Sequence, residues 1–140
     1  MSMKKHYNSW DEIEEHQQEI VDWLFSNANI ICWTNYPDNI WQKLGLTSWE
    51  KNFHFAEMFE KFRPHFIRKT VDDLEYGNQY YKGGKIFSHY FFKIEGTVKD
   101  YINKEGPIAS GPGFWDPIYY KDKYMIANTI GQEGMINIFE

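Results

Sequence analysis

The sequence predicts an α+β fold in which N-terminal helices pack on a C-terminal antiparallel sheet of four to five strands. Apolar residues recur at helical spacing in the first half of the chain, within residues 9–29 and 47–66. From about residue 78 the pattern changes to short runs rich in Tyr, Phe and Ile, separated by glycine-containing turns. Helices followed by antiparallel strands are typical of the α+β class. A length of 140 residues fits one domain covering residues 1–140.

The clearest helical pattern is the first one, SWDEIEEHQQEIVDWLFSNAN, residues 9–29. Ser9 is suited to cap this helix, and Glu12, three residues later, can reach back to the amide of the cap. The residues expected to form its buried stripe are Trp10, Ile13, Gln17, Ile20, Val21 and Leu24. We therefore expect one continuous helix with a single apolar face.

The second helical region follows a short apolar run. Residues 30–33, IICW, are expected to form a strand or buried coil, and residues 36–46 a short helix that starts near Pro37 and ends at Gly45. Thr47 begins the longer helix, which ends or kinks at Pro64. One more helical turn is expected at residues 70–78.

Strands are predicted in the second half of the chain. A Gly-Gly pair at residues 83–84 separates two aromatic runs within residues 78–96, which indicates a hairpin. Residues 97–106 favour a short helix. After it, residues 117–140 read as three short strands with turns at residues 121–123 and 131–134.

The composition excludes several classes of protein. A net charge of −5 argues against nucleic-acid binding, because phosphate contacts need clustered Lys and Arg. Cys32 is the single cysteine, so it rules out an intramolecular disulfide and fits a reducing compartment. We see no signal peptide and no stretch approaching the roughly 20 apolar residues of a membrane span. The sequence predicts a cytoplasmic protein that binds neither nucleic acid nor membrane.

Candidate catalytic and metal-binding residues do not form a known pattern. His54 and Glu57 are three residues apart, with His65 and His89 elsewhere, but there is no His-Glu-x-x-His motif. Cys32 has apolar neighbours and no basic group beside it in the sequence, so we expect an inert thiol. We expect no metal, no cofactor and no catalytic residue.

Carboxylates dominate the first predicted helix. Between Ser9 and Asn27 there is no Lys or Arg. The acidic residues there that we consider candidates for binding a partner are Asp11, Glu12, Glu15, Glu19 and Asp22. Like charges four residues apart in a helix destabilise it by about 0.2–0.5 kcal/mol per pair. Three explanations remain open: a solvated helix face, neutralisation by the basic residues of 61–69, or a basic partner protein.

The segment GPIASGPGFWDPIYY, residues 106–120, predicts a long loop of defined shape, because its prolines restrict the backbone and its glycines permit positive φ. Phe114 and Trp115 either anchor this loop or contact a partner. Asp116 is a turn former, a general base or a salt-bridge residue. Tyr119, with Trp115, is a candidate aromatic anchor for a partner.

Three functions are compatible with these observations. The first is a small acidic protein-binding module that neutralises a basic toxin or nuclease. In size, acidity and lack of catalytic motif the chain is similar to bacterial immunity proteins, a likeness of type and not of sequence. The second is a small enzyme or ligand-binding protein with an aromatic-lined pocket, in which Asp116 or His89 is the acid-base group and Tyr90 donates a hydrogen bond. The third is a structural or oligomeric accessory domain.

Overall fold

A computed structural model of the chain describes residues 6–35, 53–71, 88–112, 115–131 and 133–139. The helices in these ranges are α1 (Trp10–Glu15), α2 (Gln17–Asn27), α4 (Phe53–Phe62), the short 3-10 helix η2 (Arg63–His65) and α5 (Gly96–Glu105). The strands are β1 (His6–Tyr7), β2 (Ile30–Asn35), β3 (Phe66–Val71), β4 (Ser88–Lys93), β5 (Trp115–Lys121), β6 (Tyr124–Ile130) and β7 (Met135–Ile138).

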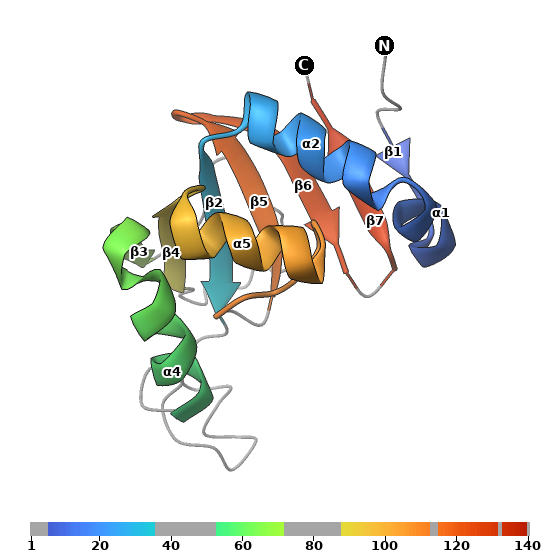
Figure 1. The fold of residues 1–140 in the computed structure, drawn as a ribbon. Coiled ribbons are helices and arrows are strands. Elements are labelled where there is room, and N and C mark those ends of the chain that lie inside the picture. The colour runs from blue at the N-terminus through green and yellow to red at the C-terminus, as the bar shows by residue number, and fades with distance from the viewer. Residues whose placement is uncertain (1–5, 36–52, 72–87, 113–114, 132, 140) are drawn as a thin grey trace.

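The strands of the described residues form one antiparallel sheet in the order β1-β7-β6-β5-β2-β4-β3. The strands β5, β6 and β7 are joined in sequence by short turns. The central strand β2 pairs with β5 on one side and with β4 on the other. The first and last strands along the described chain, β1 and β7, are neighbours at one edge of the sheet (Figure 1).

The prediction of N-terminal helices on a sheet of four to five strands is wrong. The sheet has seven strands in the described residues, and the helices are distributed along the chain: α4 follows β2, and α5 lies between β4 and β5. Two strands escaped the sequence analysis for physical reasons. β1 is only two residues long, which is too short to show an alternating pattern. In β3 a register shift between Phe66 and Arg68 interrupts the alternation of side chains.

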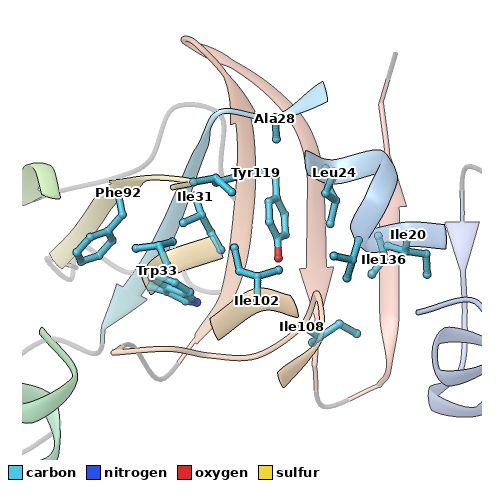
Figure 2. Packing of buried hydrophobic residues seen from close by; sticks show 14 of the residues in the cluster. Ile20, Leu24, Ala28, Ile31, Trp33, Phe92, Ile102, Ile108, Tyr119 and Ile136 are labelled. Carbon is cyan, nitrogen blue, oxygen red and sulfur yellow. The ribbon is translucent and has the colours of Figure 1, made fainter. Parts of the chain in front are cut away.

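The helices lie on one face of the sheet. Figure 1 shows α2 and α5 crossing in front of the central strands, with α4 beyond the β3–β4 edge and α1 beside β7. Figure 2 shows the side chains of the two layers meeting; those labelled from α2 and α5 are Ile20, Leu24 and Ile102, and those from the strands include Ile31, Trp33, Phe92, Tyr119 and Ile136. Burying one such side chain stabilises the fold by about 1.5–3 kcal/mol.

The opposite face of the sheet also carries buried side chains. Cys32, Phe91, Ile118 and Tyr120 form a second apolar cluster there. Burial raises the pKa of the Cys32 thiol from 9.0 to about 12, since the thiolate is disfavoured away from water. The expectation of an inert thiol therefore agrees with its surroundings.

The first predicted helix is two helices. The chain leaves the helical conformation at His16, which has φ −111° and ψ 15°, and α1 and α2 meet there. The imidazole of His16 lies against the ring of Tyr7, with 5.8 Å between ring centroids. The predicted N-cap is confirmed: the amide of Glu12 donates to Ser9 Oγ over 3.1 Å. The Glu12 carboxylate accepts from the amide of Asn8 (3.1 Å), one residue before the expected partner.

Most of the other local predictions in the described ranges are confirmed. Residues 30–33 lie within β2, residues 97–105 within α5, and the turns at 121–123 and 131–134 separate β5, β6 and β7. α4 ends at Phe62, two residues before Pro64. Residues 70 and 71 belong to β3 and not to the expected helical turn. The elements expected at residues 36–46 and the glycine hairpin at 83–84 lie outside the described residues.

The turn between β5 and β6 is fastened to the loop between α2 and β2. Asn29 Nδ2 donates to Asp122 Oδ1 (2.9 Å), and the amide of Asp122 donates to Asn29 Oδ1 (2.8 Å). The backbone of Asn29 continues the link, since its amide donates to Tyr120 and its carbonyl accepts from Ile94. Asp122 has φ 55°, a conformation that Asp tolerates better than most residues.

Among the described helices, none has the length and apolar character that crossing a membrane requires.

Candidate functional site

The candidate site is the acidic surface of α1 and α2, which we define by Asp11, Glu14, Glu15 and Asp22. All four side chains are exposed. The first three lie on α1 and Asp22 lies on α2, so the break at His16 divides the expected ribbon of carboxylates between two helices. Asp22 Oδ1 accepts a hydrogen bond from the side-chain Nε2 of Gln18 (2.8 Å), a neutral group.

Two other predicted carboxylates have roles inside the fold. Glu12 is half-buried and completes the cap at the start of α1. Glu19 is also half-buried, and its carboxylate lies 3.2 Å from His16 Nδ1. Because both side chains are occupied by local contacts, we place Glu12 and Glu19 at the margin of the acidic surface.

No Lys or Arg of the described residues forms an ion pair with Asp11, Glu14, Glu15 or Asp22. The basic segment 61–69 was one expected source of neutralisation, but it belongs to α4, η2 and β3. β3 lies at the sheet edge opposite to β1 and β7, the strands beside α1 (Figure 1). The hypothesis that residues 61–69 neutralise the acidic surface is therefore wrong.

The basic residues near that far edge interact with a carboxylate and with aromatic rings. Arg63 pairs with Glu60 (2.5 Å between Nη2 and Oε1), which lowers the pKa of Glu60 through a hydrogen bond and charge attraction. The guanidinium of Arg68 lies 4.1 Å from the centroid of the Phe91 ring. The ammonium of Lys69 lies 5.5 Å from the centroid of the Tyr90 ring. These contacts keep the positive charges at the β3 edge.

Trp10 is a surface residue that the sequence analysis placed in the buried stripe. It is 49% exposed, because α1 ends at Glu15 and does not continue the apolar face of α2. Its backbone and indole lie against Gly134: a Cβ on that glycine would come within 2.6 Å of the Trp10 nitrogen and 2.8 Å of Cδ1. The exposure of Trp10 follows from the break between α1 and α2 at His16. The helical spacing of the sequence does not indicate that break.

The loop that follows α5 is fixed from inside the core. Trp33 Nε1 donates to the carbonyl of Ala109 (2.9 Å), and the hydroxyl of Tyr119 donates to the carbonyl of Pro107 (2.6 Å). Gly111 has φ 53°, and a Cβ there would come within 2.7 Å of Trp33 Cδ2. The start of the expected loop is therefore anchored by side chains of β2 and β5, whereas residues 115–120, also expected in the loop, belong to β5.

The predicted contact residues near this loop are dispersed. Tyr119 is 1% exposed and points into the core beneath α5 (Figure 2), so its surface is not available to a partner. Burial raises its pKa well above its usual range. Asp116 is half-buried, and its carboxylate packs against Gly131 at the end of β6. Trp115 is the first residue of β5, and Phe114 lies outside the described residues.

Two residues of the enzyme hypothesis, His89 and Tyr90, lie on opposite faces of the sheet. His89 and Tyr90 are consecutive in β4, so their side chains point to opposite faces of the sheet. His89 Nδ1 lies 2.8 Å from Thr34 Oγ1, whereas Tyr90 packs against Phe55 and Phe59 of α4. Within the described ranges, no group of three His, Cys, Asp or Glu side chains is placed to hold a metal ion.

Comparison of the chain with protein-family models, curated proteins and solved structures gave no significant match.

Proposed function

We propose that the protein is a cytoplasmic protein-binding module that inhibits a basic partner, such as a toxin or nuclease, through the acidic surface of α1 and α2. The observation that supports this proposal is the exposure of Asp11, Glu14, Glu15 and Asp22 without an ion pair to any Lys or Arg of the described residues. The basic residues of 61–69 lie on α4, η2 and β3, with β3 at the far edge of the sheet, and form no ion pair with these carboxylates.

Charge complementarity is the mechanism of the proposed inhibition. Asp11 and Glu15 are four residues apart, and their repulsion destabilises α1 by about 0.2–0.5 kcal/mol. A cationic surface would relieve that repulsion when it docks. Clustered charge of one sign also accelerates the encounter of two proteins, by about 10-fold to 1,000-fold at low ionic strength. An inhibitor that must reach its target quickly benefits from such acceleration.

The surface we propose is smaller than the one expected from the sequence. Asp11, Glu15 and Asp22 remain its centre, together with the exposed Glu14. Tyr119 is omitted because it is part of the core. A contribution of Phe114 and Trp115 stays a prediction.

The proposal is tested by capturing partners of the tagged protein from its own cells with three forms of the chain. These are the wild type, the triple variant Glu14→Lys, Glu15→Lys, Asp22→Lys, and the matched variant Lys61→Glu, Arg68→Glu, Lys69→Glu at the opposite edge. We expect a basic protein with the wild type and with the matched variant, and none with the acidic-surface variant. With the purified pair, the association rate should fall about tenfold or more on charge reversal and should fall steeply with added salt.

The purified partner also provides the functional measurement, because inhibition requires loss of the partner's own activity when the chain binds. Circular dichroism should show the same helix content in all three forms, since every substituted side chain is exposed. A partner that binds the acidic-surface variant as fast as the wild type would contradict the proposal.

A further inference from the structure

We propose that Trp10 binds an arginine side chain of the basic partner, on a platform formed by α1 and the turn between β6 and β7. We define this Trp10 platform by Trp10, Asp11, Glu14 and Glu133. The inference rests on the proposed function and names the chemical group that the acidic surface would recognise, a guanidinium.

Trp10 is held in place although it is exposed. It is the first residue of α1, directly after the Ser9 cap that fixes the start of the helix. The β6–β7 turn approaches it so closely at Gly134, which has φ 66°, that no side chain would fit there. That turn is closed by hydrogen bonds from the amides of Glu133 and Gly134 to the carbonyls of Ile130 and Gly131, both 3.2 Å. An aromatic ring that is ordered before binding loses little conformational entropy on contact.

Carboxylate residues neighbour Trp10 on two separate elements, α1 and the β6–β7 turn. Asp11 follows Trp10 directly, and Glu14 is four residues after it, which places Glu14 beside Trp10 on the helix surface. Glu133 comes from the β6–β7 turn and is exposed next to Gly134. A cation that stacks on this ring would therefore meet negative charge on the helix side and on the turn side.

Two other exposed aromatic residues of the described part of the chain, Tyr124 and Phe66, have different surroundings. Tyr124, 66% exposed at the start of β6, already has the ammonium of Lys123 at 5.7 Å from its ring centroid. Phe66, at the start of β3, packs against Phe59 and shares its strand with basic residues. In the described part of the chain no cation lies over Trp10. Trp10 therefore differs from Tyr124 and Phe66 in having carboxylates nearby and no cation over its ring.

Arginine fits the Trp10 platform better than lysine. Its planar guanidinium stacks on an aromatic face while its N–H groups donate to carboxylates at the sides. The ammonium of lysine is a compact, strongly hydrated charge that forms the ion pairs but does not stack. The platform therefore predicts discrimination between two cations of equal charge.

The test uses two short synthetic peptides, one alternating glycine with arginine and the other glycine with lysine, titrated into the isotopically labelled protein at low salt. The indole N–H signal of Trp10 is assigned by its disappearance in the Trp10→Phe variant. We expect this signal to shift on titration, and the arginine peptide to bind about two- to fivefold more tightly than the lysine peptide, the advantage of one exposed cation–π contact.

Variants separate the inference from the proposed function. Trp10→Ala should abolish the preference for arginine while leaving the lysine peptide's affinity nearly unchanged, and Trp10→Phe should keep part of the preference. Tyr124→Ala is the matched control, an exposed aromatic whose loss should change nothing. Charge reversal at Glu15 and Asp22 should weaken both peptides equally.

Each remaining outcome is informative. If both peptides bind equally and Trp10→Ala alters neither, the acidic surface binds cations but the assignment to Trp10 is wrong. If neither peptide perturbs the signals of α1 and α2, the proposed function is contradicted and the inference with it. The thermal midpoint of each variant, measured alongside, shows that the substitutions leave the fold intact.

Discussion

Trp33 connects the centre of the sheet to the loop that follows α5, and it is completely buried. Its indole stacks on Phe62 of α4, with 5.6 Å between centroids and 13° between ring planes. Tyr101 of α5 meets it edge-on. The indole N–H holds Ala109, and Gly111 covers the ring where a side chain would collide. Trp33 thus contacts α4, α5 and the loop that follows α5 at the same time.

Replacing Gly111 by alanine should destabilise the protein strongly. The new Cβ would collide with the Trp33 ring, and φ 53° is unfavourable for alanine. Together these effects should lower the free energy of unfolding by roughly 2–4 kcal/mol. Urea unfolding measures the change. Ser110→Ala, at the exposed neighbouring position, is the control and should alter stability by no more than about 0.5 kcal/mol.

At the scale of elements, the β5–β6 hairpin depends on Asn29, a residue between α2 and β2. Its side chain exchanges two hydrogen bonds with Asp122 in the hairpin turn, and its backbone bonds to Tyr120 and Ile94. A residue from outside the hairpin therefore stabilises the positive φ of Asp122. The consequence is that α2, β2 and the hairpin form one unit.

The variant Asn29→Ala should separate these elements. It removes the two side-chain hydrogen bonds with Asp122, each worth about 0.5–1.5 kcal/mol, so we expect a loss of about 1–3 kcal/mol in unfolding free energy. Amide hydrogen exchange should accelerate at residues 121–124 before it does in the rest of the sheet. Asn103→Ala, on the exposed side of α5, should leave both measurements unchanged; equal exchange in the two variants would contradict the role of Asn29.

Local signals in the sequence predicted elements, and contacts distant in sequence decided their arrangement. The Ser9 cap and the turn at residues 121–123 were predictable because a few neighbouring residues specify them. The exposure of Trp10 was not, because it depends on the break at His16 and on Gly134. The same holds for β1, whose two residues become a strand only by pairing with β7.

The acidic candidate residues were found from charge alone, since residues 9–27 contain several carboxylates and no Lys or Arg. Which of them are available required the structure: Glu12 and Glu19 have local partners, and Tyr119 lies in the core. Burial of an aromatic residue in a seven-stranded sheet depends on strand order, which the sequence did not reveal.

At the scale of the whole molecule, both faces of the sheet bury groups that lose a proton at high pH. Desolvation raises the pKa of Cys32 to about 12, and it raises the pKa values of Tyr119 and Tyr120 above their usual range. In the folded state these groups keep their protons, whereas in the unfolded chain Cys ionises above about pH 9.0 and Tyr above about pH 10.0. The folded state then binds more protons than the unfolded state.

Stability should therefore fall on the alkaline side. The contribution of these groups is fully present below about pH 9 and declines as the pH rises toward 12, by up to about 1.4 kcal/mol per pH unit for each fully buried group. Urea unfolding at several pH values between about 7 and 11 measures the slope. Cys32→Ala should flatten it most between pH 9.0 and 10.0, where the thiol of the unfolded chain ionises ahead of its tyrosines; an unchanged slope there would show that the thiol is not responsible.

The pairing of β1 with β7 also has a consequence for how the protein is made. His6 and Asn137 hydrogen-bond across 131 sequence positions, so β1 cannot pair with β7 until residues 135–138 have left the ribosome. Trp10 likewise lacks its contact with Gly134 until that glycine has been synthesised. Copies that stop before Met135–Ile138 would carry the carboxylates of α1 but not the surface against which that helix is seated. α1 therefore gains its contacts with β7 only after residues 135–138 have been synthesised.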